Sequence, residues 1–211
     1  MVEFAGLSQA LQQGDSAKVV ELVRRALEEK IKPMKIVNKG LLHTMDIIGD
    51  SFEREEIFLP ELIVSAQAMK AGMDILRPIL SETGEKPKAK IVMGTVQGDM
   101  HDIGKNLVGM ILQGAGFEVI DLGTDINSEK FIQALRENDA PLLGLSALLT
   151  TTMMEMKTVI NDLRKECMRE RVKVIIGGAP TSQEFADEIG ADGHAPDAIS
   201  AKDKINELLE S

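Results

Sequence analysis

The run of residues from Asp99 to Gly104 combines a carboxylate, an imidazole and a glycine at the spacing Asp-x-His-x-x-Gly. A carboxylate that holds one ring nitrogen of a histidine fixes its tautomer and raises the basicity of the other nitrogen, which is what a metal ligand needs. Asp99 stands two residues before His101, within reach of its ring. The run alone leaves two interpretations open: a metal-binding histidine, His101, supported by Asp99, and an ordinary solvated histidine in a strand-to-helix turn.

Few other side chains in the sequence suit a transition metal. The chain has three histidines and one cysteine, and none of His43, His194 and Cys167 stands at a ligand spacing from His101. Zinc sites need three or four protein ligands, so zinc is disfavoured. A single protein histidine on a metal implies that the metal brings its other ligands with it.

The elements that position this run belong to an α/β domain. Four short apolar segments are expected strands: 91–94, 117–120, 142–145 and 172–176. They alternate with helical segments: 105–113, 128–137, 152–168, 183–189 and 198–209. With a weaker fifth strand near 191–193, this alternation predicts a doubly wound parallel sheet, Rossmann-like, with the flavodoxin order 2-1-3-4-5. Ligands of such sheets bind at the carboxyl ends of the first and third strands, here the loops 95–104 and 146–152.

The first half of the chain has the period of α-helices instead. Apolar residues recur every three or four positions in four segments: 4–11, 19–26, 34–48 and 62–76. Breaks at Gly14, Pro33 and Pro60 separate these segments. The pattern predicts four amphipathic helices in an N-terminal four-helix bundle.

A polar stretch, Thr83 to Lys88, carries a glycine and a proline between the two halves and indicates a linker. We therefore expect a helical-bundle domain over residues 1–84 and a sheet domain over residues 85–211.

The composition argues against nucleic-acid and membrane partners. The 24 basic and 34 acidic residues give a net charge of -10, which disfavours binding to phosphate backbones. No apolar run reaches the roughly 18 residues of a membrane helix, and the first residues lack the pattern of a signal peptide. We expect a cytoplasmic protein.

Three other kinds of doubly wound domain require residues that the two loops lack. A dinucleotide site needs G-x-G-x-x-G, and Gly94, Gly98 and Gly104 have a different spacing. A phospho-receiver domain needs an aspartate at the end of the third strand, where this chain has Ser146. A flavodoxin needs a phosphate loop rich in hydroxyls and aromatic residues beside the flavin ring, whereas the chain has no Trp and no Tyr.

With these motifs the sequence resembles the cobalamin-binding proteins that hold their cofactor base-off and His-on. Their signature is D-x-H-x-x-G after the first strand, S-x-L after the third and G-G after the fourth. The matching residues here are Asp99 to Gly104, Ser146 to Leu148, and Gly177 with Gly178. The resemblance covers essentially the whole chain and is close, over 98–106, to the cobalamin domain of methionine synthase and to small corrinoid proteins of methyltransferase systems.

The resemblance implies roles for individual residues. His101 would bind cobalt in place of the cofactor's own benzimidazole, and Asp99 would hold the other ring nitrogen. Thr152 stands where methionine synthase has a serine hydroxyl that hydrogen-bonds this carboxylate. The nucleotide tail would enter a slot between the first and third strands, where glycines leave room and Ser146 and Thr150 can bond to it. The implied corrinoid-binding residues are Gly98, Asp99, Met100, His101, Asp102, Ile103, Gly104, Gly144, Ser146, Leu148, Thr150, Gly177 and Gly178.

The helical half resembles the cap that covers the upper face of the cofactor in those proteins. Candidate shielding residues are Ile57, Phe58, Leu62, Met69 and Met73.

In function, the resemblance implies a methyl carrier that has no catalytic activity alone. A substrate-specific corrinoid methyltransferase would load the cobalt, a tetrahydrofolate- or coenzyme M-dependent methyltransferase would unload it, and a reductive activase would maintain it. Donors in this family include methanol, methylamines, betaines and methoxylated aromatics. The stretch 94–101 is most similar to the trimethylamine and betaine branch.

Two other classes share the cobalamin domain and stay open as alternatives. A cobalamin-dependent regulator carries a DNA-binding helix-turn-helix ahead of the bundle, whereas the first bundle helix here begins near Phe4. The small cobalamin-binding subunit of an adenosylcobalamin isomerase typically lacks the four-helix cap.

Overall fold

The computed structural model describes residues 4–82 and 87–210, which fall into two compact units. One unit comprises the helices of the first half together with Gln113–Ala115, and the other comprises Pro87–Leu112 and the residues from Gly116 onward. Residues 83–86 of the predicted linker lie outside the described residues. No helix in the described part of the chain combines the length and apolar character needed to cross a membrane.

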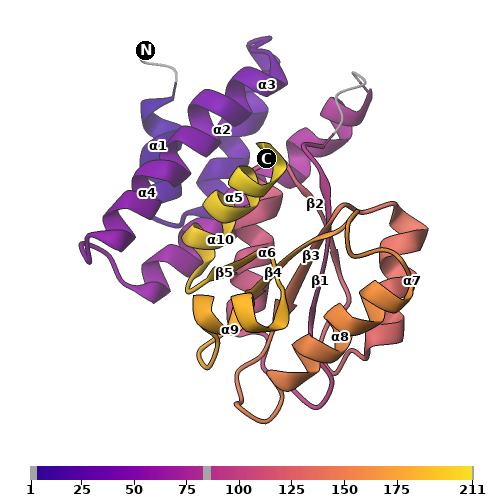
Figure 1. Cartoon of the computed structure of the whole chain (residues 1–211). Coiled ribbons are helices and arrows are strands. Elements are labelled where there is room, and N and C mark those ends of the chain that lie inside the picture. Colours follow the sequence, from indigo (N-terminus) through magenta and orange to yellow (C-terminus); the bar gives the residue numbers. More distant parts are fainter. Residues whose placement is uncertain (1–3, 83–86, 211) are drawn as a thin grey trace. The chain divides into compact units, whose positions relative to one another are not determined.

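The helical unit follows the predicted pattern of breaks. Its elements are α1 (Ala5–Gln12), α2 (Ser16–Glu28), α3 (Pro33–Lys35), η1 (Ile36–Leu42), α4 (His43–Glu53) and α5 (Leu59–Glu82) (Figure 1). The side chain of Asp15 caps α2 by accepting a hydrogen bond from the backbone N–H of Lys18 at 2.9 Å. Helix α5 packs along α2 and also contacts α1, α4 and η1. Their apolar faces form one core that includes Leu11, Val19, Val23, Ile36, Leu41, Leu62, Met69, Met73 and Leu76.

The third predicted helix is a continuous run of α3, η1 and α4 whose middle segment is a π-helix of seven residues. A π turn adds one residue to a helical turn, and the three-and-four spacing of apolar residues does not reveal it. A Cβ atom on Gly40 would lie 2.7 Å from Cδ2 of Leu7, so a larger residue there would have to displace the Leu7 side chain of α1. The buried hydroxyl of Thr44 donates to the carbonyl of Gly40 at 2.7 Å.

The second unit is a five-stranded parallel sheet in the order β2-β1-β3-β4-β5, which confirms the predicted strand order. Its strands are β1 (Lys90–Thr95), β2 (Glu118–Asp121), β3 (Leu142–Ser146), β4 (Lys173–Gly177) and β5 (Gly193–Ala195). Its helices are α6 (Ile103–Gly114), α7 (Ser128–Asn138), α8 (Met154–Lys165), α9 (Gln183–Ile189) and α10 (Ala198–Glu210). Helices α6 and α10 lie on one face of the sheet, and α7, α8 and α9 lie on the other (Figure 1).

Burial on both faces explains why the central strands are almost entirely apolar. In β1 every residue from Ile91 to Thr95 is buried, and β3 is buried from Leu142 to Leu145. The register pairs Thr95 with Ser146, and Ser146 with Gly177, so these strands end level with one another. The loops that follow β1, β3 and β4 therefore emerge together at one edge of the sheet.

Most predicted elements differ from the structure by a few residues at their ends, and two of these differences have a visible local cause. Helix α8 begins at Met154 rather than at 152 and ends at Lys165, because Cys167 adopts a left-handed conformation with φ of 55°. Strand β5 begins later than predicted, at Gly193. The carboxylate of Asp192 just before it accepts a hydrogen bond from the backbone N–H of Val174 and pairs with Arg169.

Candidate functional site

Asp99 is fully buried and lies at the centre of a hydrogen-bond network after β1. Its Oδ1 atom accepts hydrogen bonds from the backbone N–H and the ring Nδ1 of His101, at 3.0 and 2.7 Å. Its Oδ2 atom accepts from the hydroxyl of Thr152 at 2.7 Å, and from the backbone N–H groups of Leu148 and Leu149 at 2.8 and 3.3 Å. The carboxylate thus joins the β1–α6 loop to the β3–α8 loop.

The network determines the charge state of this carboxylate. Burial by itself raises the pKa of a carboxyl group, because it disfavours the charged form. Here the hydrogen bonds from the backbone of His101 and Leu148, from the Thr152 hydroxyl and from the His101 ring outweigh burial, and they hold the pKa of Asp99 well below its ordinary value of 3.8. Asp99 is therefore an anion at neutral pH and acts as an acceptor toward His101.

His101 is fixed on one side and open on the other. Its carbonyl accepts a hydrogen bond at 2.9 Å from the hydroxyl of Thr95, a buried residue at the end of β1. Because Nδ1 faces the Asp99 carboxylate, we assign the proton to Nδ1, which leaves the lone pair on Nε2. The side chain of His101 is 52% exposed. The ring is thus oriented to offer Nε2 to a ligand.

Large apolar side chains on the same two loops, and on the first residues of the helices that follow them, are exposed. Met100 in the β1–α6 loop and Ile103 at the start of α6 are 70% and 74% exposed. Leu148 and Leu149 in the β3–α8 loop and Met154 at the start of α8 are between 42% and 47% exposed. Exposed apolar groups gathered on the loops of one sheet edge indicate a binding surface. The surface suits a large ligand with apolar edges.

The glycines of the predicted site behave in different ways. A Cβ atom on Gly104 would meet nothing within 4 Å, so the start of α6 is open there. A Cβ atom on Gly178, which has φ of 123°, would lie 1.8 Å from the carbonyl oxygen of Ala147. On Gly177 it would lie 3.0 Å from the carbonyl oxygen of Ala195. These two glycines allow backbones to approach closely, and the slot for the nucleotide tail stays a prediction.

Gly144 differs from that pair, because a Cβ atom there would meet the side chain of Met93, at 3.2 Å. The space beside Gly144 is therefore occupied by a flexible side chain, which a ligand can displace more easily than a backbone. The remaining predicted residues lie on the same edge: Ser146 ends β3 half-buried, Thr150 is exposed in the next loop, and Asp102 accepts a hydrogen bond from Asn106 at 3.0 Å.

Sequence reasoning missed the contribution of the β2–α7 loop. Asp125 accepts a hydrogen bond from the backbone N–H of Gly98 at 2.8 Å. The buried Lys105 pairs with Asp121 at the end of β2, with Nζ–O distances of 2.7 and 2.5 Å. Neither aspartate stands in the three motifs, and the only available signal was that the second strand must lie beside the first.

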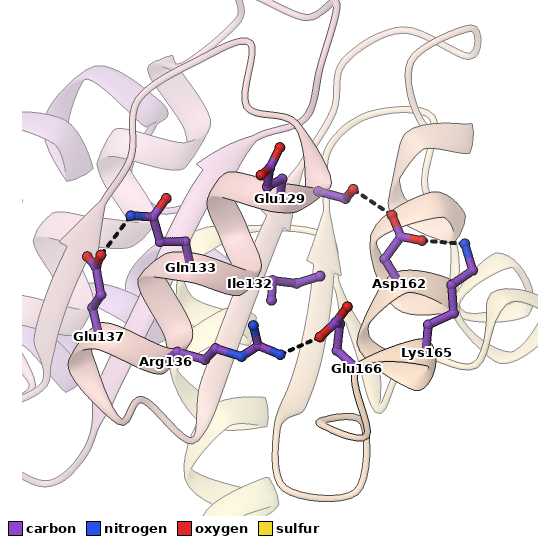
Figure 2. Close-up of a pocket in the computed structure, with 9 residues that line it drawn as sticks. Glu129, Ile132, Gln133, Arg136, Glu137, Asp162, Lys165 and Glu166 are labelled. Atoms are coloured by element: carbon purple, nitrogen blue, oxygen red, sulfur yellow. Dashed lines mark hydrogen bonds and ion pairs between the residues drawn. The ribbon is translucent and has the colours of Figure 1, made fainter.

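A separate groove lies between α7 and α8 (Figure 2). Its volume is about 610 Å³, and its polar side chains pair with one another: Ser128 and Lys165 with Asp162, Arg136 with Glu166, and Gln133 with Glu137. None of the site residues predicted from the sequence lines this groove.

The donor set at His101 fits a metal that carries its own ligands. In residues 4–82 and 87–210, no group of three or more His, Cys, Asp or Glu side chains could hold a metal ion. A corrinoid needs only one axial protein ligand, with an apolar surface for the ring. The open Nε2 of His101 and the exposed apolar side chains around it fit these two requirements.

Comparison with known proteins supports a corrinoid ligand. Two family models, each described as a B12 binding domain, match residues 89–202 and residues 3–77. A corrinoid protein of Desulfitobacterium hafniense (strain Y51) is 45% identical over 206 residues, 96% of this chain and 95% of the relative. Dimethylamine corrinoid protein 3 of Methanosarcina acetivorans is 46% identical over 91% of this chain and 90% of its own length.

Solved structures show the same fold. A cobalamin-binding protein from Desulfitobacterium hafniense DCB-2 has a TM-score of 0.80 at 30% identity, covering 95% of this chain and 96% of that chain. The methanol:cobalamin methyltransferase complex MtaBC from Methanosarcina barkeri has a TM-score of 0.86 at 28% identity, covering 99% of this chain and 80% of that chain. The chain therefore belongs to the family of B12-binding corrinoid proteins.

Proposed function

We propose that this protein carries a methyl group on the cobalt of a base-off, His-on corrinoid, between a substrate-specific methyltransferase and a second methyltransferase. The observation that carries the proposal is the network of His101, Asp99 and Thr152, in which a half-exposed ring is held by a buried carboxylate. The bound corrinoid supplies the methyl-carrying metal. The names of the relatives, which include dimethylamine corrinoid proteins, support the carrier role.

In this proposal each residue has one task. His101 would hold the metal through Nε2, while its Nδ1 donates a hydrogen bond to Asp99. Thr152 and two backbone N–H groups hold Asp99 as an anion. The strength of the hydrogen bond from Nδ1 to Asp99 would then change with the electron density that Nε2 donates to a metal. The exposed apolar side chains of Met100, Ile103 and Leu148 would pack against the bound corrinoid and exclude water from the metal ligand.

We extend the proposal to the helical half. Residues 1–84 would act as a cap over the upper face of the corrinoid. Phe58, at 69% exposed, and Leu59, at 47%, lie at the start of α5 and offer an apolar surface for this task. Of the other candidate shielding residues, Leu62, Met69 and Met73 are buried in the helical core, and Ile57 is half-buried.

The proposed partners are a donor methyltransferase, an acceptor enzyme that uses tetrahydrofolate or coenzyme M, and a reductive activase. Methylated amines are the proposed donor class, because several relatives of 43% to 46% identity are named dimethylamine corrinoid proteins. Methanol, betaines and methoxylated aromatics are the competing donors in a transfer assay. A regulator would bind DNA and an isomerase subunit would need adenosylcobalamin, so each alternative has its own assay.

The test is reconstitution with cobalamin followed by desalting. We expect one corrinoid per chain, and the Co(II) form should show axial nitrogen coupling in its electron paramagnetic resonance spectrum. In protein labelled with nitrogen-15 histidine, the coupling should show the nitrogen-15 pattern, and His101→Ala should abolish this histidine-derived coupling. The matched control is His43→Gln, at an exposed histidine of the helical unit, which should leave the histidine-derived coupling intact. A wild-type signal that ignores the histidine label, and so comes from the cofactor's own benzimidazole, would contradict the assignment of the ligand.

A further inference from the structure

Asp125 holds the segment before His101 at two points. Its carboxylate accepts a hydrogen bond from the backbone N–H of Gly98 at 2.8 Å, and its own backbone N–H donates to the carbonyl of Asp99 at 3.0 Å. Gly98 has a left-handed conformation with φ of 82°. The two bonds bracket the Gly98–Asp99 dipeptide, so Asp125 fixes both its position and its direction.

The conformation of Asp125 is itself unusual. It is one of a few non-glycine residues with positive φ in the described part of the chain, at 56°. This region is unfavourable for most side chains, and aspartate and asparagine tolerate it best. Such a conformation persists where the surrounding structure requires it. Here it directs both the backbone N–H and the carboxylate of Asp125 toward the same dipeptide.

The β2–α7 loop is rigidly attached to β1 on either side of this contact. The backbone N–H of Thr95 donates to the carbonyl of Gly123 at 2.9 Å, and that of Ile126 donates to the carbonyl of Thr95 at 3.0 Å. At the other end of the loop, Asp121 accepts from the N–H of Gly123 at 2.9 Å and pairs with the buried Lys105. Asp125 therefore fixes the position of the loop that carries His101 relative to the β2–α7 loop.

Asp99 is consequently held from two directions. The β3–α8 loop holds its side chain through Leu148 and Thr152, and Asp125 holds its main chain. We propose that Asp125 is a positioning residue for the metal ligand. By fixing the main chain of Asp99, it aligns the Asp99 carboxylate with Nδ1 of His101 and so sets the ring orientation. The relevance of this role to cobalt rests on the proposed function.

The role depends on hydrogen-bond geometry, not on the charge of Asp125. Asp125→Asn keeps an oxygen acceptor and tolerates the left-handed backbone, so it should behave as the wild type. Asp125→Gly removes the acceptor but keeps the backbone conformation accessible, so the chain should still fold. Asp139→Gly is the matched control, because Asp139 is also an exposed aspartate with positive φ, at the end of α7.

The first measurement needs no cofactor. Nitrogen-15 shifts of the His101 ring in the apoprotein, at a pH where the ring is neutral, report the ratio of its two tautomers. The chain has three histidines, so His43→Gln and His194→Gln complete the assignment. We expect the Nδ1–H tautomer to dominate in the wild type, in Asp125→Asn and in Asp139→Gly. In Asp125→Gly the tautomer ratio should fall several-fold.

The second measurement uses the reconstituted protein. In Asp125→Gly, the fraction of Co(II) centres with axial nitrogen coupling should fall, and corrinoid affinity should weaken about 10-fold, at the lower end of the effect of changes around a metal ligand. Wild-type tautomer ratios in Asp125→Gly overturn the proposal, as does a loss in Asp125→Asn equal to that in Asp125→Gly. If the wild type itself lacks nitrogen coupling, the proposed function fails while the apoprotein measurement still decides the role of Asp125.

Discussion

Two polar regions of the sheet unit are built in opposite ways. At the carboxyl edge of the sheet, a single buried carboxylate, Asp99, gathers donors from positions 101, 148, 149 and 152. In the groove between α7 and α8, charged side chains form exposed pairs. Arg136 and Glu166 are 54% and 47% exposed, and Lys165 is 74% exposed beside Asp162 (Figure 2).

The difference shows how a site can be told from an ordinary charged surface. Exposed ion pairs contribute little to stability, because water already solvates both partners. A buried carboxylate is tolerated only where every acceptor position finds a donor, so its neighbours are constrained. The edge of the sheet has this constraint, and the groove does not.

The largest expected effect comes from removing the buried acceptor. Asp99→Ala leaves the hydroxyl of Thr152 and the backbone N–H groups of His101 and Leu148 without their charged partner. We expect the free energy of unfolding to fall by about 3 kcal/mol, because hydrogen bonds to charged groups are worth roughly 1.5–3 kcal/mol. Urea denaturation with unchanged m-value measures this loss. A change below about 1 kcal/mol would mean that water replaces the carboxylate.

A smaller loss is expected when only one donor to Asp99 is removed. Thr152→Val removes the hydroxyl and preserves the shape of the side chain, and should lower the free energy of unfolding by about 1–2 kcal/mol in the same urea denaturation. Thr152→Ser keeps the hydroxyl and should retain most of the stability and all of the axial nitrogen coupling.

A third polar group, the Nε2 atom of the half-buried His194, sharpens the comparison because this atom is buried without a partner. In the described residues its Nε2 atom has no hydrogen-bond acceptor or donor. Burial lowers the pKa of His194 below its ordinary value of 6.5, and the nearby Glu184 offsets only part of this effect. The unfolded chain therefore binds a proton more readily than the folded one.

The sign of the pH effect follows from that difference. The contribution of His194 to stability is fully present above the ordinary value of 6.5 and is lost as the pH falls toward the folded pKa. Urea midpoints at pH 7.5 and 5.5 should therefore differ more in the wild type than in His194→Gln. If the urea midpoints of the wild type and of His194→Gln changed equally with pH, the His194 ring would bind a proton as readily in the folded chain as in the unfolded chain.

The smallest effect is expected in the groove. Glu166→Ala breaks the exposed pair with Arg136 and should change the free energy of unfolding by no more than about 0.5 kcal/mol. Corrinoid affinity and the nitrogen coupling should match those of the wild type. A loss of either would place the groove in the functional site and would remove the distinction between the two regions.

Much of the fold follows from local signals. Continuous apolar runs predict the buried parallel strands, and the prolines at 33 and 60 mark helix starts in the structure. Structural features that depend on a single residue are harder to predict. No periodic pattern of apolar residues marks the π turn in η1, the left-handed Cys167 after α8, or the late start of β5. The spacing of apolar residues predicts which face of a helix or strand is buried, but it does not predict the backbone conformation of a single turn.

At the site, the sequence by itself determined the residues that stand close along the chain. Asp99, His101 and Gly104 share one loop, and two residues suffice to bring a carboxylate to a ring nitrogen. For Thr152, 53 positions away, spacing along the chain gave no such contact: the family resemblance implied it, and the tertiary structure shows the hydrogen bond. Only the tertiary structure decided that Asp125 holds the main chain of Asp99. Those contacts depend on β1 lying between β2 and β3, where parallel register brings three loops to one edge. Spacing along the chain does not contain that geometry, because it arises from hydrogen bonds between strands.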